Sequence, residues 1–109
     1  MTVGTIYFIQ AGGITGPIKI GYTKNQANVR KKCAQTYNHL ALELLADTAG
    51  TQPEEKALHG RFRRYRIRGE WFNPAPPIME LIAAIMDDGL RISNWLEGYT
   101  SPDDDDDRI

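Results

Sequence analysis

The sequence predicts one small domain that combines β-strands with α-helices. Its 109 residues are enough for one hydrophobic core and little more. Residues 5–23 have the alternation of β-branched and aromatic residues that favours a hairpin. Residues 51–64 and 76–99 have helix start signals and apolar residues at helical spacing. Together these observations indicate a domain of the α/β class.

The hairpin has the sequence TIYFIQAGGITGPIKIGYT. Thr5–Gln10 and Ile18–Tyr22 are the predicted strands, and the glycine-rich residues between them are typical of a turn. Because side chains two residues apart share a face, Lys19 and Gly21 lie on one face of the second strand. If Tyr7 pairs near Lys19, that face carries a phenol, an ammonium group and a glycine that admits a ligand, which suits phosphate chemistry. The alternative, which these residues alone favour, is an ordinary amphipathic hairpin.

A helix and a third strand are expected next. Residues 25–36 predict a helix that begins at an asparagine N-cap, and Arg30 opens its basic run. Cys33 is expected to be buried, and because it is the only cysteine the chain has no internal disulfide and no cysteine-rich metal site. Residues 37–39 are expected to form a loop. Leu40–Ala46 predicts a buried strand, although its periodicity also permits a short helix.

The next helix has the clearest start signal in the chain. Thr51 is the expected N-cap and Glu54 completes a capping box. Leu58 and Phe62 lie four residues apart and define the core face, and the helix is expected to end at Phe62 or two residues later. Glu55 falls on the same apolar side, where a carboxylate is costly unless a cation compensates it. The alternative is a first-turn glutamate that stabilises the helix dipole, which fits Glu54 better.

Residues 61–68 alternate arginines with aromatic and apolar residues. Arginine forks match phosphates and aromatic rings stack on bases, so this pattern predicts nucleic-acid binding. A basic edge strand is the alternative. After the run, Trp71 and Phe72 are expected in the core, and Glu70 is either a ligand or a partner for an arginine. The guanidinium groups belong to Arg61, Arg63, Arg64, Arg66 and Arg68.

The C-terminal part predicts two helices and an acidic tail. Two prolines open a helix over residues 78–88, which a glycine ends, and a second helix spans residues 90–99. Five consecutive aspartates make residues 101–109 a disordered acidic tail. The predicted organisation is a single domain over residues 1–100, with its core at residues 4–75 and C-terminal helices at residues 76–100.

Charge is divided unevenly along the chain. Residues 1–75 hold eleven Lys/Arg and five Asp/Glu, a formal charge of +6, whereas residues 76–109 hold two and nine, a formal charge of −7. The basic body predicts a polyanionic partner, and a division that only aids solubility is the alternative. No stretch is long and apolar enough to cross a membrane and no signal-peptide pattern is present, so the cytoplasm is the expected compartment.

The order of these elements resembles the GIY-YIG nuclease superfamily. Thr5-Ile6-Tyr7 is similar to the GIY half of its signature and Lys19-Ile20-Gly21 to the YIG half. The runs GPIKIGYT, ELLA, EKALHGRF and RGEWF are similar to a phage-type, Orf172-like branch that is often labelled a DNA-binding domain. The resemblance covers about residues 4–75.

The resemblance implies a small α/β (α+β) domain in which helices flank a three-stranded antiparallel sheet, here with extra C-terminal helices. It also implies a DNA endonuclease that depends on a divalent cation, Mg²⁺ or Mn²⁺. One carboxylate and several waters suit Mg²⁺, which keeps much of its hydration shell. No organic cofactor and no membrane partner is expected, and the resemblance says nothing of the oligomeric state.

The resemblance also implies roles for particular residues. Tyr7 matches the tyrosine that is a candidate general base, Arg30 matches the helix arginine that stabilises charge at the phosphate, and Glu55 matches the glutamate that holds the cation. Lys19 stands where the better-known nucleases have tyrosine. It can hold a phosphate, but it cannot transfer a proton at neutral pH without a large pKa shift, so a DNA-binding module with weak or no catalysis is the alternative.

Two sets of residues complete the predicted site. His59 and Glu70 belong to motifs of this branch and are expected near the same cleft, and Asn73 is the candidate for the family's late asparagine. A protein-interaction domain that uses the two tryptophans and the last helices is a third reading. The predicted catalytic residues are Tyr7, Lys19, Arg30, Glu55 and His59. The predicted nucleic-acid-binding residues are Lys19, Tyr22, Lys24, Arg30, Arg61, Arg64, Arg66 and Arg68.

Overall fold

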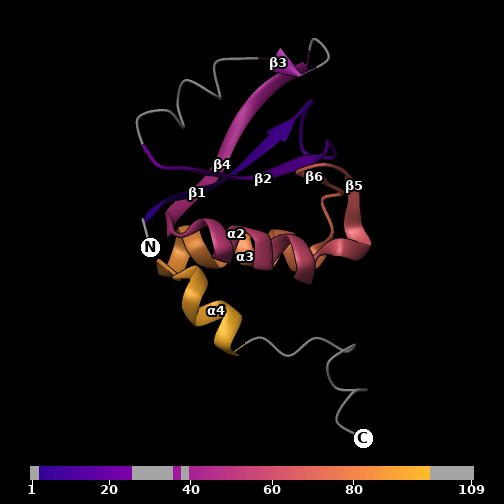
Figure 1. The fold of residues 1–109 in the computed structure, drawn as a ribbon. Coiled ribbons are helices and arrows are strands. Elements are labelled where there is room, and N and C mark those ends of the chain that lie inside the picture. The colour runs from indigo at the N-terminus through magenta and orange to yellow at the C-terminus, as the bar shows by residue number, and fades with distance from the viewer. Residues whose placement is uncertain (1–2, 26–35, 38–39, 99–109) are drawn as a thin grey trace, which may run out of the picture.

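A computed structural model describes residues 3–25, 36–37 and 40–98 of the chain, and these form an antiparallel sheet with helices packed against it (Figure 1). The strands are β1 (Gly4–Ala11), β2 (Ile18–Thr23), β3 (Thr36–Tyr37), β4 (Leu40–Gly50), β5 (Arg66–Arg68) and β6 (Trp71–Phe72). The helices are α2 (Gln52–Arg61), the 3-10 turn η1 (Arg63–Tyr65), α3 (Pro76–Asp88) and α4 (Ile92–Gly98).

The prediction of a three-stranded sheet is wrong, because the sheet has six strands in the order β3-β4-β1-β2-β6-β5. The three expected strands form its centre, where β1 pairs with both β2 and β4. The short β6 and β5 extend the sheet beyond β2, which makes the arginine-bearing β5 an edge strand. Gly69 permits this extra hairpin, since its φ of 54° lies in the left-handed region that glycine adopts without strain.

The hairpin register differs from the expected one by two residues. Tyr7 pairs with Gly21, and Lys19 pairs with Ile9. Residues directly opposite in an antiparallel pair share a face, so all four side-chain positions still lie on one side of the sheet. The Tyr7 ring lies over Gly21, where a Cβ atom would collide with it. Glycine is therefore required at this position by close packing.

The two faces of the sheet bury different residues, as the alternation predicts. The face that carries Tyr7 and Ile9 buries both and packs them against Leu42 and Leu44 of β4. The other face is covered by α2 and α3 (Figure 1). Trp71 is only half-buried, whereas Phe72 is fully buried as predicted. The main core on the helix-covered face includes Ile6, Phe8, Ile18, Ile20, Leu58, Phe62, Phe72, Ile78 and Leu81.

Helix α2 begins as the sequence predicts. The Thr51 hydroxyl accepts a hydrogen bond from the Glu54 amide at 3.3 Å, and the Glu54 carboxylate accepts one from the Thr51 amide at 2.9 Å. Leu58 and Phe62 have no exposed surface, which confirms the predicted core face. Helix α3 ends at Gly89, whose φ is 64°, and α4 is shorter than the predicted helix at residues 90–99.

The segment between β2 and β4 is described only in part. Most of the predicted helix, with Arg30 and Cys33, lies outside the described residues, as does the predicted tail at residues 101–109. Thr36 and Tyr37 were expected at a helix end and in a loop, but they form β3 and pair with β4. The predicted strand at Leu40–Ala46 is confirmed and continues to Gly50, so the alternative of a short helix is wrong. The expected burial is wrong, because Ala46 and Gly50 are the only buried residues of β4 and Leu40 is exposed.

Candidate functional site

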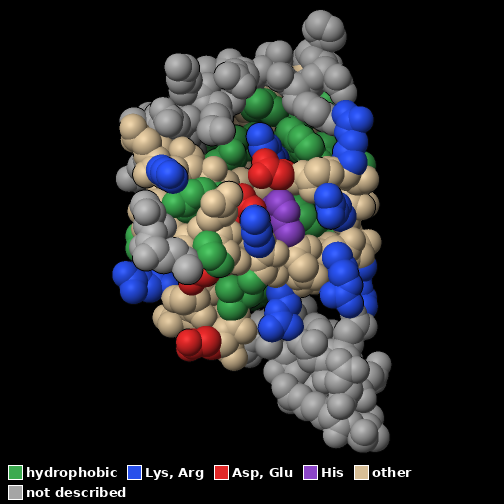
Figure 2. All heavy atoms as spheres, in the orientation of Figure 1, with side chains coloured by type: hydrophobic (Ala, Val, Ile, Leu, Met, Phe, Trp, Pro, Cys, Tyr) green, Lys and Arg blue, Asp and Glu red, His purple; other side chains and the backbone are tan. Residues whose placement is uncertain are grey.

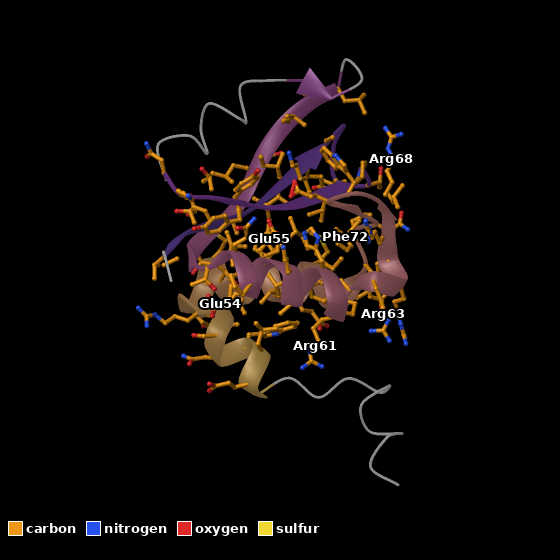
Figure 3. The ribbon with its side chains drawn as sticks, viewed as in Figure 1. Glu54, Glu55, Arg61, Arg63, Arg68 and Phe72 are labelled. Carbon is orange, nitrogen blue, oxygen red and sulfur yellow. The ribbon has the colours of Figure 1, made fainter. Side chains whose placement is uncertain are left out.

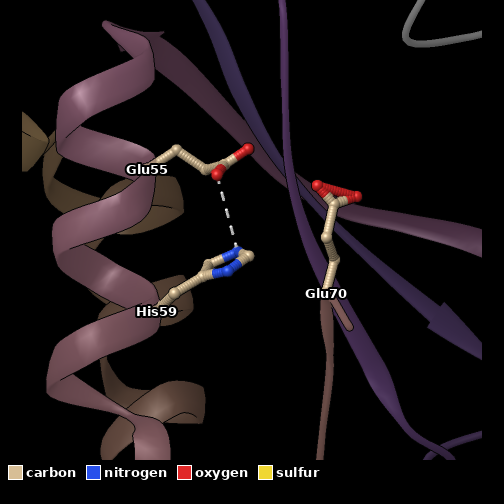
Figure 4. A group of neighbouring side chains, drawn as sticks. All are labelled: Glu55, His59 and Glu70. Carbon is tan, nitrogen blue, oxygen red and sulfur yellow. Dashed lines mark ion pairs between the residues drawn. The ribbon is translucent and has the colours of Figure 1, made fainter. Parts of the chain in front are cut away.

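Three predicted site residues meet where α2 crosses β2. One ligand atom from each of Glu55, His59 and Glu70 lies within 4.8 Å of the others, a spacing that could hold a metal ion (Figure 4). Glu55 and His59 are four residues apart on α2 and therefore project from the same face of the helix. Glu70 comes from the tight turn between β5 and β6.

Glu55 is the buried member of this cluster, with 6% of its surface exposed. Burial raises the pKa of its carboxyl above the ordinary value, since water no longer solvates the charge. His59 lowers the pKa and Glu70 raises it, and Lys56 and Lys19 lower it further. An ionised carboxylate at this place is incompletely compensated, so a cation beside it would be strongly favoured.

His59 connects α2 to the edge of β2. Its Nε2 lies 2.8 Å from the carbonyl oxygen of Ile20 and 3.7 Å from Oε1 of Glu55. A carbonyl oxygen only accepts hydrogen bonds, so the proton of this bond is on Nε2. The imidazole also meets the ring of Phe72 edge-on, with centroids 5.1 Å apart and planes at 69°. In this position Nε2 is a donor, and it would have to leave Ile20 before it could bind a metal.

Lys19 forms the outer boundary of the cluster. Its Nζ lies 3.7 Å from Oε1 of Glu70, and the two side chains are 29% and 42% exposed. The backbone holds both residues in place, because the amide of Ile20 donates to the carbonyl of Glu70 at 3.0 Å and Lys19 pairs with Trp71. The cluster is thus closed on the side of Glu55 and open to solvent on the side of Lys19.

The surface around the cluster is rich in cations. Figure 2 shows a histidine and acidic side chains at the surface with lysines and arginines around them. Arg61 is half-buried, and the other arginines of residues 61–68 are exposed. The side chains of Arg61, Arg63 and Arg68 point outward, whereas Glu55 lies between α2 and the sheet (Figure 3). The Arg63 Nη1 donates to the carbonyl of Gly60 at 3.1 Å.

The other predicted site residues lie outside the cluster or outside the described part of the chain. Tyr7 is 1% exposed and lies on the face of the sheet opposite to α2, with its ring over Gly21. Lys24 and Asn73 are exposed, and Tyr22 is partly buried against the main core. Because Arg30 is outside the described part of the chain, the predicted convergence of Tyr7, Arg30 and Glu55 stays a prediction.

Two contacts of the cluster had no clear signal in the sequence. The Lys19–Glu70 ion pair depends on the unexpected β5–β6 hairpin, and the bond from His59 to Ile20 joins residues 39 positions apart. The spacing of Glu55 and His59 on one helix face was the only local sign of a cluster. The ring of Trp95 packs on Phe62 with centroids 5.5 Å apart, which gives this tryptophan a role in the core.

Comparison with known proteins gives one family. The model of the T5orf172 domain matches residues 4–88, which include β1 to α3, the three residues of the cluster and Lys19. Searches of curated proteins and of solved structures find no significant match. Among the helices of the described residues, none is long and apolar enough to cross a membrane. Since the match spans most of the sequence, the chain belongs to the T5orf172 domain family.

Proposed function

We propose that this chain is a DNA-binding domain of the GIY-YIG type that cleaves phosphodiester bonds with the help of a divalent cation. The cluster of Glu55, His59 and Glu70 is the observation that carries this proposal. A buried carboxylate with a raised pKa stabilises the fold poorly when ionised, so a functional role is the simpler reason for its presence.

The donor set fits a hard cation such as Mg²⁺ or Mn²⁺. Glu55 and Glu70 offer carboxylate oxygens, which such ions prefer, and the partly exposed side of the site leaves room for water ligands. The bound ion would polarise a phosphoryl oxygen and make a water more acidic. His59, whose Nε2 donates to the Ile20 carbonyl, would flank the ion beside Glu55, with Nε2 3.7 Å from Oε1 of Glu55.

The remaining roles concern the nucleic acid. Arg30 would stabilise the developing charge at the phosphate. For Tyr7 to act as the general base, its hydroxyl must reach the cluster at Gly21 of β2, over which its ring lies. Lys19 would bind a phosphate oxygen at the open side of the cluster. The arginines of η1 and β5 precede Glu70 in the chain. They would bind the phosphate backbone of the DNA on either side of the cleaved bond.

A binding module without turnover is the second candidate. Its support is Lys19, which holds Glu70 at 3.7 Å and cannot accept a proton as a tyrosinate would. In this case the arginine surface would bind DNA and the cluster would serve the fold.

Nicking of supercoiled plasmid separates the two candidates. We expect nicking with Mg²⁺ or Mn²⁺ and none with a chelator, and Glu55→Ala should reduce it to background because the buried carboxylate is lost. Glu80→Gln is the matched control, since Glu80 is an exposed glutamate of α3 away from the cluster.

The outcomes of this assay have separate meanings. Equal background nicking by the original chain and Glu55→Ala would refute the endonuclease. DNA retention that falls with rising salt would then support the binding module. No retention at low salt would reject both candidates.

A further inference from the structure

The Glu70 carboxylate lies near two positions for a cation. Its Oε1 lies 3.7 Å from Nζ of Lys19. One of its oxygens also lies within 4.8 Å of the ligand atoms of Glu55 and His59. A divalent ion among those atoms and the Lys19 ammonium would share this one carboxylate, and two cations so close repel each other.

The charges of the cluster show what Lys19 does without a bound ion. Glu70 raises the pKa of Glu55 by repulsion between carboxylates, and Lys19 lowers it. Lys19 therefore partly neutralises both acids. In the described structure its Nζ contacts Glu70 from the open side of the site.

The Lys19–Glu70 ion pair can break so that Glu70 binds another cation. Both side chains are partly exposed, and ion pairs of this kind are weak because water competes for each charge. The backbone of Lys19 is fixed between β1 and β6, where it pairs with Ile9 and Trp71. Only the flexible four-carbon side chain has to move, and its open direction is toward solvent, where a bound phosphate would lie.

We propose that Lys19 is a metal-released phosphate ligand: Glu70 holds it in the cation-free site, and when Glu70 turns to a divalent cation, Lys19 Nζ becomes available to a DNA phosphate. This inference rests on the proposed metal-dependent function. It makes cation binding and DNA binding cooperative through a single side chain, and such coupling is reciprocal.

The inference requires that one substitution changes two affinities in opposite directions. Lys19→Met removes the competing ammonium and keeps most of the stem, so Mn²⁺ should bind roughly two- to fivefold more tightly, the range expected of a half-exposed ion pair. The same variant should lose the gain in DNA affinity that Mn²⁺ gives to the original chain. Removal of a residue that only binds phosphate would lower DNA affinity equally with and without Mn²⁺ and would leave Mn²⁺ binding unchanged.

Lys56→Met is the matched control. Lys56 is exposed on α2 and also lowers the pKa of Glu55, ahead of Lys19, but the Glu70 ion pair belongs to Lys19. Both variants remove one positive charge near the same carboxylate. If charge alone sets the affinity for the cation, the two variants will tighten Mn²⁺ binding equally.

The experiment is titration calorimetry with Mn²⁺ in the absence of DNA, followed by fluorescence anisotropy of a short duplex with and without Mn²⁺. Tighter Mn²⁺ binding by Lys19→Met than by Lys56→Met, with loss of the Mn²⁺-dependent gain for DNA, supports the inference. Unchanged, weaker or equally tightened Mn²⁺ binding overturns it. Lys19→Gln repeats the test if the methionine variant does not fold.

The result is independent of turnover. If the original chain binds no Mn²⁺, the proposed metal centre fails together with the exchange. If it binds Mn²⁺ and Lys19→Met shows both changes, the exchange holds even where no plasmid is nicked. If it nicks plasmid but Lys19→Met does not tighten Mn²⁺, only the exchange is refuted.

Discussion

The start of α2 and its inner face use adjacent glutamates for opposite purposes. Glu54 at the helix start accepts hydrogen bonds from the amide and the hydroxyl of Thr51, at 2.9 Å and 3.2 Å, and remains partly exposed. Glu55 on the inner face is buried beside a second carboxylate, and its pKa is raised. The first side chain explains why the helix begins where it does. The second opposes folding when ionised, which points to a purpose outside the fold.

The largest expected effect tests whether the inner face is a true core surface. Leu58, one turn after Glu55 on α2, has no exposed surface. Leu58→Ala should lower the free energy of unfolding by about 2–5 kcal/mol, because it removes packed methyl groups and leaves a cavity. Denaturant titration measures this. A loss below about 1 kcal/mol would mean that α2 is not packed on the sheet as described.

The next effect tests the helix start. Thr51→Ala removes the hydroxyl that accepts from the Glu54 amide and should lower the free energy of unfolding by about 1 kcal/mol. Affinity for Mn²⁺ should not change, because the Thr51 hydroxyl bonds to Glu54 and the backbone bond from the Glu55 amide to the Thr51 carbonyl is kept. Thermal unfolding and calorimetry on the same sample check both statements, and a parallel loss of Mn²⁺ binding would contradict the separation of the two regions.

Glu55→Gln should stabilise the fold, in contrast to the two substitutions above. The pKa of Glu55 is raised above its ordinary 4.5, so the folded chain holds the proton more tightly than the unfolded chain does. The stabilisation from this proton is present at low pH and is lost as pH rises through 4.5 and then the folded pKa. In the presence of a chelator, Glu55→Gln should therefore raise Tm at pH 7.

The gain in Tm should vanish at pH values well below 4.5, where the carboxyl is protonated in both states. A Tm that falls at pH 7, or a gain that persists at low pH, would show that Glu55 contributes to the fold as Glu54 does. The comparison between the two glutamates would then fail.

The smallest effect concerns the surface outside both regions. Arg66 is exposed on the edge strand β5. If it binds one phosphate, Arg66→Gln should weaken DNA binding at all sequences and reduce the slope of log affinity against log salt by about 1. Fluorescence anisotropy at several salt concentrations measures the slope. An unchanged slope would place the DNA path away from β5.

The sequence was sufficient for the elements with strong local signals. The capping box at Thr51 and the alternation in β1 and β2 predicted both the elements and the faces that they bury. It was not sufficient for β5 and β6, because three arginine-rich residues have little strand propensity and the hairpin depends on the left-handed Gly69.

The register of the β1–β2 hairpin was also not predictable from the sequence. The pairing of Tyr7 depends on the turn that follows β1, where the side-chain amide of Gln10 donates to the carbonyls of Ile14 and Gly16 at 3.1 Å and 2.9 Å. Such a loop cannot be deduced from glycine content alone. Of the predicted site, Glu55, His59 and Glu70 lie together, and their contacts depend on how β2 meets α2 and Glu70.

Strand β2 presents three consecutive residues to three separate parts of the molecule: Lys19 to Glu70, the Ile20 carbonyl to His59, and Gly21 to the ring of Tyr7. The position of each residue along the strand determines which partner it contacts. Inserting a single residue before Lys19 would displace all three partners in one step, whereas point substitutions would affect them one at a time.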